Sequence, residues 1–269
     1  MPMTGLAEKG GIKFFSSPLL ERAPGAVHGF LTRTGGASSP PFSSLNFSSR
    51  VGDDPGRVRQ NREAFSRAFG IPGGKIFTPV QVHGESVFVL EGGGGGGAGG
   101  GIKEAPEADA VLTAQKGVAI GVLTADCLPV LLLDPVKGAA GAVHAGRKGT
   151  ALGISGKAVG EMRTRFGSSP RDIVAAIGPH IGPCCYSVGT EVYREFERGL
   201  GVEPDFFVER DGMLYLDLAM ANVEALVSAG LHESGIETAG PCTSCRSDIF
   251  FSYRKEKETG RQLSFIMLA

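Results

Sequence analysis

The chain has 269 residues, with 27 Lys and Arg against 28 Asp and Glu, so its formal net charge is −1. A chain this close to neutrality lacks the basic field that concentrates nucleic acid or anionic membrane, and we expect neither partner. Hydrophobic residues make up 42% and charged residues 20%, which predicts a sizeable core and argues against wholesale disorder. Glycine is unusually abundant at 42 residues, which predicts many tight turns.

Nothing in the sequence indicates a membrane or secreted protein. No apolar run approaches the roughly 20 residues that a membrane-spanning helix needs. The first residues, MPMTGLAEKGGIKFF, do not have the basic segment and apolar stretch of a secretory signal. Five cysteines, an odd number, favour reduced thiols over a disulfide framework. We therefore expect a cytoplasmic protein.

Short apolar runs recur along the chain, with fewer helical patterns between them. The runs have the length of strands, and several are continuous, which predicts strands buried on both faces. The expected strands are 26–32, 75–82, 86–91, 109–113, 118–124, 128–134, 139–145, 172–178, 205–209 and 263–268. Helices are expected at about 55–69, 150–166, 189–197 and 217–227, with Asp54 and Asp217 as N-caps. These elements predict a mixed α/β domain.

A glycine tract interrupts this pattern between the strands expected at 86–91 and 109–113. Nine glycines lie between Gly92 and Gly101, broken only by Ala98. Such a segment buries too little surface to offset its loss of conformational entropy. We predict a flexible surface loop at 92–101 inside a single domain that spans residues 1–269.

Three potential metal ligands stand at the edges of apolar strands. His83 lies in VQVHGESV, Cys127 in LTADCLPVLL and His144 in GAVHAGRKGT. Two imidazoles and one thiolate suit Zn²⁺ and also copper, and three protein ligands leave a fourth position for water or substrate. The separations of 44 and 17 residues are not local chelate spacings, so two other interpretations stay open. One is a purely structural trio, and the other is a cysteine hydrolase in which Cys127 attacks, a histidine is the base and Asp126 orients a group.

The four other cysteines form two short motifs. Cys242 and Cys245 form a CxxC pair in PCTSC, and Cys184 and Cys185 are adjacent in GPHIGPCCYSVG. A structural zinc usually uses two CxxC-like pairs, and adjacent cysteines are awkward ligands for one ion. The CxxC precedes an apolar run instead of opening a helix, which argues against a thioredoxin-like site. We therefore interpret these residues as free thiols in turns.

Two stretches have the composition of anion-binding loops. The Gly/Ser-rich segment 31–54 carries Arg33 and Arg50, and FFSYRKEKETGRQLSF carries Arg254 and Arg261. Backbone N–H groups and guanidinium groups together can hold a phosphate. Solvated arginines on ordinary loops give the same pattern, so both interpretations stay open.

Seven motifs, taken in order, resemble one known family. They are TRTGGAS, LNFSSRVGDD with the later NR, QVHG, TADCLPVLL, AVHAG, GPHIGPCCYSVG and FFSYR…TGRQLSFI, spread over residues 14–268. The series is similar to the YfiH/laccase-domain family of purine nucleoside phosphorylases, once described as multicopper polyphenol oxidases. The resemblance implies an α/β fold, a single-domain four-layer α/β/β/α sandwich with two mixed sheets.

The resemblance also implies a site and an activity. Matching the motifs makes His83, Cys127 and His144 the ligands of Zn²⁺, with copper possible, and places them in the catalytic site. Arg33 in TRTGG is the implied contact with substrate or phosphate, and Arg254 in FFSYR is a second candidate. The implied reactions are phosphate-dependent cleavage of adenosine, inosine and 5′-methylthioadenosine, and hydrolytic deamination of adenosine. The implied partners are a purine nucleoside and phosphate, and we expect a monomer or a small homo-oligomer.

Three other functions stay open. A copper polyphenol oxidase with a multicopper centre would need more ligands than five scattered histidines readily provide. A cysteine hydrolase acting on peptidoglycan precursors would work without a metal. A metal-binding partner module would hold zinc without turning over any nucleoside.

The sequence departs from the family in three motifs. Arg147 and Lys148 stand where the family has Trp and Arg, so a cation replaces an aromatic surface beside a metal ligand. Ser187 stands where Glu is common, which removes one carboxylate. His180 occupies a variable position, where it could add an imidazole near the site.

Overall fold

Two six-stranded sheets organise the computed structural model, which describes residues 5–71, 76–91, 105–200, 204–238 and 240–269. The first sheet has the order β1-β2-β3-β15-β7-β4. Its strands are β1 (Ala7–Lys9), β2 (Ile12–Phe15), β3 (Ala26–Leu31), β15 (Gln262–Leu268), β7 (Ala119–Thr124) and β4 (Ile76–Phe77). The β4–β7 pair is parallel and the other pairs are antiparallel, so the sheet is mixed.

The second sheet is also mixed and has the order β14-β10-β8-β9-β6-β5. Its strands are β14 (Ile236–Thr238), β10 (Val174–Ile177), β8 (Leu128–Asp134), β9 (Ala139–Ala145), β6 (Ala110–Thr113) and β5 (Val87–Leu90). The outer pairs, β10 with β14 and β5 with β6, are parallel. A third, small sheet has the order β11-β13-β12 and consists of β11 (Ser187–Val188), β13 (Met213–Leu216) and β12 (Phe207–Arg210).

The central strands of the second sheet are buried on both faces, as their continuous apolar sequences predict. Along β8, Leu128, Val130 and Leu132 pack on the side that the helices cover. The alternate residues Leu131 and Leu133 pack between the two sheets, against side chains of β7 and β15. Burying each such side chain stabilises the fold by roughly 1.5–3 kcal/mol, so this strand alone fixes the stacking of three layers.

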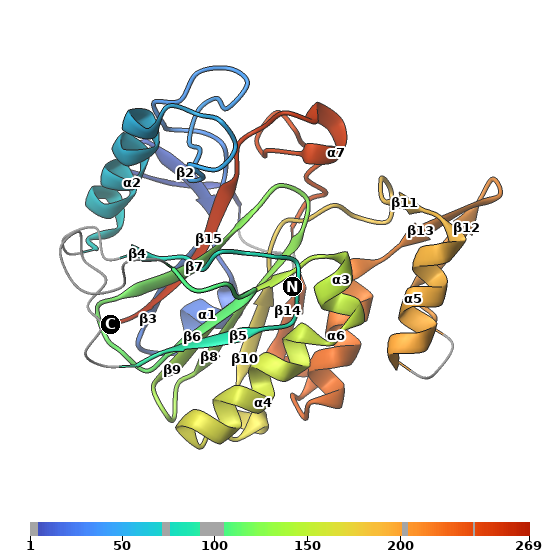
Figure 1. The fold of residues 1–269 in the computed structure, drawn as a ribbon. Helices are drawn as coiled ribbons and strands as arrows, with labels where there is room; N and C mark the ends of the chain where they lie inside the picture. The colour runs from blue at the N-terminus through green and yellow to red at the C-terminus, as the bar shows by residue number, and fades with distance from the viewer. Residues whose placement is uncertain (1–4, 72–75, 92–104, 201–203, 239) are drawn as a thin grey trace.

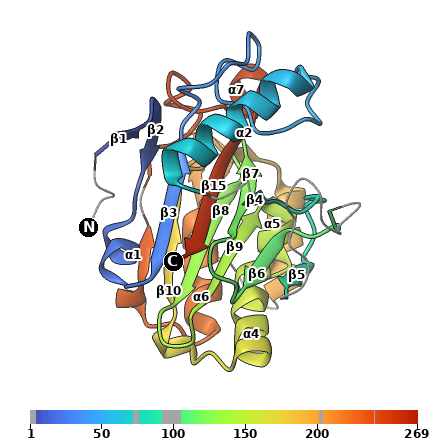
Figure 2. The ribbon, with the colours of Figure 1, turned by 90° about the vertical axis from the view of Figure 1, so that its left-hand side faces the viewer.

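Helices cover the outer face of each sheet. Helix α2 (Pro55–Phe69) packs on the first sheet, and α4 (Ile154–Phe166) and α6 (Leu218–Ser228) pack on the second (Figure 1). The view in Figure 2 shows α2 crossing the first sheet at one end of the molecule and α4 lying at the other. The remaining helices are α1 (Pro18–Arg22), α3 (Arg147–Ala151), α5 (Thr190–Leu200) and α7 (Tyr253–Glu256). The expected four-layer α/β/β/α sandwich is confirmed.

Two predicted helices have the expected caps, and one was predicted too long. The Asp54 carboxylate accepts the N–H of Arg57 at 2.9 Å, and Asp217 accepts the first N–H groups of α6. The helix expected at 150–166 is instead two helices, because Gly153 adopts a left-handed conformation with φ of 74°. Strands β1, β2, β11, β13 and β14 were not expected, and each has four residues or fewer.

The flexible loop predicted at 92–101 lies outside the residues that the structure describes. Among the described helices, none is long and apolar enough to cross a membrane.

The imidazole of His28 lies on β3 inside the fold. Its side chain is 6% exposed and accepts the N–H of Ser17 at 2.9 Å. Burial lowers the pKa of His28 to about 4, against the opposing influence of Glu21 and Glu237.

We predict that His28 makes the protein less stable in mild acid. The unfolded chain binds a proton at His28 near pH 6.5 and the folded chain only near pH 4, so stability is lost as pH falls between these values. The loss at pH 4 is about 3 kcal/mol. Urea unfolding at several pH values should show a smaller acid loss in His28→Asn, while His232→Asn, at an exposed histidine, should match the parent. Equal pH dependence in all three proteins would contradict the prediction.

Candidate metal centre

His83, Cys127 and His144 lie together, although 44 and 17 residues separate them along the chain. One ligand atom of each residue lies within 4.8 Å of the other two, and the two imidazole rings are nearly perpendicular with centroids 4.9 Å apart. Cys127 comes directly before β8 and His144 lies near the end of β9. Because β8 and β9 pair antiparallel, with Leu128 opposite Ala145, the hairpin brings the thiol and the imidazole to the same edge. His83 reaches that edge on a loop between β4 and β5.

The buried carboxylate of Asp109 holds this loop against the strand that carries His144. Its two oxygens accept the backbone N–H groups of Val82, His83 and Gly84 at 3.2, 3.0 and 2.7 Å. The same carboxylate contacts Nδ1 of His144 at 2.7 Å. His83 has a φ of 59°, a conformation that the three N–H bonds stabilise. Asp109 therefore orients one imidazole directly and the other through its backbone.

Gly146 lies among the three side chains. A Cβ at this position would be 3.2 Å from Cδ2 of His83, 3.3 Å from Sγ of Cys127 and 3.5 Å from Cε1 of His144. Only a residue without a side chain lets the three groups come this close without displacement. The glycine of the AVHAG motif is thus part of the site.

The thiol of Cys127 and the imidazole of His144 shift each other's pKa. Burial opposes ionisation of Cys127, but the positive charge and hydrogen bond of His144, with help from His83, lower the pKa of the thiol. Burial also opposes the charged form of His144, yet Cys127 and Asp109 raise its pKa. The metal-free site therefore favours a thiolate beside an imidazolium.

The three residues have the properties that a metal ion requires. A thiolate is the ligating form of cysteine, and Cys127 is easily ionised here. Asp109 occupies Nδ1 of His144, which leaves Nε2 for a metal, the usual arrangement of a carboxylate behind a ligating histidine. Two nitrogens and one sulfur suit zinc or copper. The residues present fit a single ion held by His83, Cys127 and His144.

Asp126 does not orient the histidine as the hydrolase interpretation expected. Its Oδ1 accepts the hydroxyl of Thr243 at 2.7 Å and its Oδ2 accepts the N–H of Arg254 at 2.6 Å. Asp126 therefore anchors two loops beside Cys127. The carboxylate that orients the histidine is Asp109. The sequence did not reveal this role, because an aspartate directly before an apolar strand is common and carries no signal of function.

The guanidinium of Arg33 binds protein groups in this structure. It donates to the carbonyl oxygens of Ser43 and Ser247 at 2.8 Å each and to the Glu256 carboxylate at 2.7 Å. It also lies 4.7 Å from the centre of the Phe251 ring. Arg33 thus holds the segment 247–256 in place, and its contact with substrate stays a prediction.

Two other arginines lie close to the site and have no acidic partner in the described part of the chain. Arg254 and Arg261 are half-buried, and neither takes part in a described salt bridge. Arg254 donates to the Ser187 carbonyl at 2.9 Å and lies 5.2 Å from the centre of the Tyr186 ring. Burial lowers the pKa of Arg261, opposed by the charges of Cys127 and Asp126. These guanidinium groups make the surroundings of Cys127 attractive to an anion.

Arg147, Ser187 and His180, which depart from the family motifs, each contact a different part of the protein. Arg147 forms a salt bridge with Glu195 on α5. The Ser187 hydroxyl lies 3.5 Å from Arg254, so the missing glutamate would have stood beside this guanidinium. His180 contacts the carbonyl of Gly178 at 2.9 Å, and burial lowers its pKa. It is not among the described ligand atoms that gather with those of His83, Cys127 and His144.

The fold and the site define an α/β protein with two layers of mixed sheet and a His–Cys–His ligand set at one edge. Comparison with known proteins agrees. The chain belongs to the family described as multi-copper polyphenol oxidoreductase laccase, whose model matches residues 27–269.

Proteins similar to this chain carry the name purine nucleoside phosphorylase in bacteria and in mammals. The chain is 39% identical over 245 residues to a purine nucleoside phosphorylase of Streptomyces coelicolor, covering 91% of this chain and 96% of that protein. It is 39% identical to purine nucleoside phosphorylase YlmD of Geobacillus stearothermophilus over 246 residues, 90% of each chain. The crystal structure of YlmD has a TM-score of 0.89 with 35% identity, covering 99% of this chain and 98% of that one.

We predict that Gly146→Ala weakens metal binding without unfolding the protein. The added methyl group displaces His83 and Cys127 by a few tenths of an ångström, and such changes around a metal typically lower affinity about tenfold. Competition with a chromogenic zinc chelator measures the effect. Gly160→Ala, at an exposed helical glycine whose Cβ meets nothing within 4 Å, is the matched control. Unchanged zinc affinity in Gly146→Ala would contradict the predicted site.

Proposed function

We propose that this chain is a purine nucleoside phosphorylase with a single zinc ion held by His83, Cys127 and His144. The observation that supports it best is the combination of this ligand set with Arg254 and Arg261, two half-buried guanidinium groups without acidic partners among the described residues. The named relatives, which match nearly the whole chain, support the same reaction class. The proposed partners are a purine nucleoside and phosphate, and the proposed location is the cytoplasm.

In phosphorolysis a phosphate oxygen forms a bond to the anomeric carbon of the sugar while the bond to the purine nitrogen breaks. The products are the sugar 1-phosphate and the purine, which takes up a proton. The enzyme needs no nucleophilic side chain for this exchange, so positioning and charge stabilisation supply most of the rate. We assign Arg254 and Arg261 to the phosphate. Arg33 supports them by holding segment 247–256, and a direct contact with phosphate stays its predicted role.

Tyr186 is the aromatic side chain we assign to the purine. It is half-buried, and its hydroxyl interacts with the charges of Cys127, Arg147 and Arg254. An aromatic ring at that position can stack on a base. The stack would compensate for the tryptophan that Arg147 replaces in the family motif.

We also propose deamination of adenosine as a second reaction of the same site. When bound, zinc supplies a Lewis acid that makes water a better nucleophile near neutral pH. The protein's own contribution is to hold the ligands in place: Asp109 orients His144, and Gly146 leaves room for the three side chains.

One observation favours a second candidate, a metal-free cysteine hydrolase acting on peptidoglycan precursors. The thiolate and imidazolium of Cys127 and His144, with Asp109 behind the histidine, resemble the activated nucleophile of such enzymes. A multicopper oxidase has less support. His28 bonds to Ser17 and His232 to Ser234, so neither contributes to the site, and His83 and His144 serve one ion.

The first prediction of the proposal concerns turnover with and without zinc. The zinc-loaded protein should convert inosine and phosphate to hypoxanthine and ribose 1-phosphate, and Cys127→Ser should lose about 100-fold in kcat/KM because it lacks a ligand. Chelator-treated protein should lose the activity and regain it with zinc. If the zinc-loaded protein forms no ribose 1-phosphate, the proposed phosphorylase activity is refuted.

Two other assays test the alternative functions. Activity on peptidoglycan precursors that survives chelation and is abolished by thiol alkylation would favour the hydrolase. Oxygen uptake by a copper-loaded protein with a diphenol would favour the oxidase.

The second prediction concerns the phosphate site. Arg254→Gln and Arg261→Gln should each raise the KM for phosphate about tenfold, because each removes a charge-assisted hydrogen bond worth roughly 1.5–3 kcal/mol. The KM for inosine should change much less. Arg165→Gln, at an exposed arginine paired with Glu91, is the matched control. An unchanged phosphate KM in both variants would overturn their assignment.

A further inference from the structure

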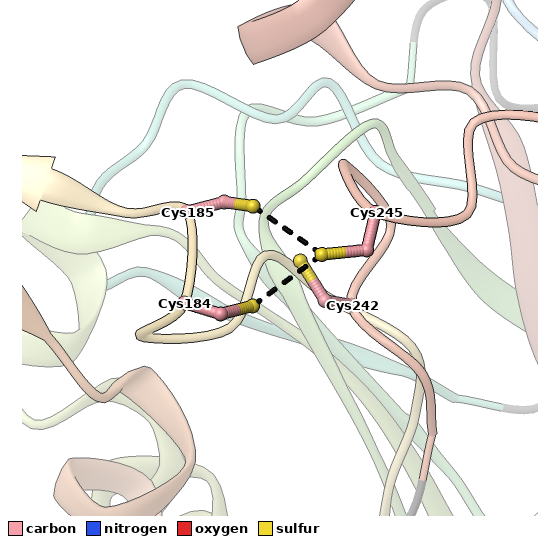
Figure 3. Close-up of side chains that lie close together, drawn as sticks. All are labelled: Cys184, Cys185, Cys242 and Cys245. Atoms are coloured by element: carbon pink, nitrogen blue, oxygen red, sulfur yellow. Dashed lines mark hydrogen bonds between the residues drawn. The ribbon is translucent and has the colours of Figure 1, made fainter.

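Four cysteines that the sequence pattern left as free thiols in turns lie together away from the ligands of the candidate metal centre. The sulfur atoms of Cys184, Cys185, Cys242 and Cys245 all lie within 4.8 Å of one another. Figure 3 shows them pointing toward a common centre, two from each of two loops. We call these residues the four-cysteine cluster. None of the five cysteines of the chain forms a disulfide.

The spacing of the sulfur atoms is that of ligands around one metal ion. Sγ of Cys245 lies 3.6 Å from Sγ of Cys184 and 3.4 Å from Sγ of Cys185. Four thiolates at 2.3 Å from a tetrahedral zinc are about 3.8 Å apart. A disulfide requires sulfur atoms about 2 Å apart. The adjacent cysteines, which looked awkward as a pair, both direct their sulfur atoms toward Cys245 because residues 183–185 form a turn.

A backbone donor at Cys242 provides a second observation. The N–H of Gly182, on the loop that carries Cys184 and Cys185, donates to Sγ of Cys242 at 3.3 Å. An N–H group directed at a sulfur stabilises a thiolate, the form that binds metals. The two loops therefore contact each other through this hydrogen bond as well as through the sulfur atoms.

We propose that the four-cysteine cluster binds one structural zinc ion. All four ligands are cysteine sulfur atoms, and zinc is the divalent ion that most often occupies such a closed set in proteins. The ion joins two loops that follow the parallel neighbours β10 and β14. Arg210 donates to the carbonyl of Pro183, beside Cys184, and places a positive charge next to the four negative ligands.

The two joined loops also contact the candidate metal centre. Ile181 donates its N–H to the carbonyl of Asp126 at 2.9 Å, and Thr243 donates its hydroxyl to the Asp126 carboxylate. The first loop continues to Tyr186, which lies against Arg254. A zinc ion in the cluster would therefore fix the loops that position the groups around Cys127, without contacting substrate itself. This inference does not depend on the proposed activity.

Metal content separates the two sites. Protein purified with zinc present should carry about two zinc ions per chain by mass spectrometry of the elements, one for each ligand set. Cys242→Ser combined with Cys245→Ser should lose one equivalent and show a lower melting temperature. Cys127→Ser, the matched control, removes a thiol from the other ligand set and should leave the four-cysteine cluster loaded.

Cobalt substitution keeps the proposal testable if the double variant fails to fold. Cobalt bound by four thiolates has much stronger sulfur-to-metal charge-transfer absorption than cobalt bound by one thiolate and two imidazoles. Cys127→Ser loaded with cobalt should therefore keep most of the near-ultraviolet absorption of the parent. Three results would overturn the proposal: loss of that absorption in Cys127→Ser, iron in place of zinc in the cluster, or four cysteines found as free thiols or disulfides in protein purified with zinc.

Discussion

The carboxylate of Asp109 is the interaction on which the candidate metal centre depends. It is fully buried and accepts three backbone N–H groups of residues 82–84 while it contacts Nδ1 of His144. A buried carboxylate is stable only when its oxygens are occupied in this way. The loop of His83 starts at the bridge between Val80 and Glu107 and ends in β5, which pairs with β6, and the Asp109 carboxylate fixes the middle of the loop relative to His144. One side chain thus converts two distant segments into a single ligand set.

The surroundings of Cys127 both disfavour and favour the charged form of its thiol. Burial disfavours a thiolate, yet His144 and His83 favour it, and a metal cation would favour it more strongly. A metal bound at Nε2 of His144 would take the place of the proton there and leave the imidazole neutral, with Asp109 still at Nδ1. The metal-free thiolate–imidazolium pair and a metal-bound ligand set would therefore be two states of the same residues, and for this reason the residue types alone fit both a hydrolase and a metalloenzyme.

Much of the fold could be predicted from the sequence, whereas the sites required the strand order. Strand β8 was recognisable because burial on both faces demands a continuous apolar run, and Asp54 marked the start of α2 because a carboxylate caps its first turn. The three candidate ligands were selected by residue type and family resemblance, but Asp109 was not, since its role arises only from contacts across the fold. The gathering of the four cysteines could not be read from the sequence for the same reason: β10 and β14 are neighbours in space, whereas the cysteines whose sulfur atoms meet are 60 and 61 residues apart in the chain.

Ser187, which stands where the resembled motif commonly has Glu, has a physical consequence for the phosphate site proposed around Arg254. A glutamate there would stand beside Arg254 and would compete with phosphate for the guanidinium. Serine and the Ser187 carbonyl instead orient Arg254 with neutral acceptors, so its charge is not cancelled. The loop that carries Ser187 is also the one that Cys184 and Cys185 would fix through a zinc ion. Asp126 holds the loop before these cysteines, by accepting the N–H of Ile181, and Arg254 holds it after them, by donating to the Ser187 carbonyl. A zinc ion at Cys184 and Cys185 would add a third anchor between the two.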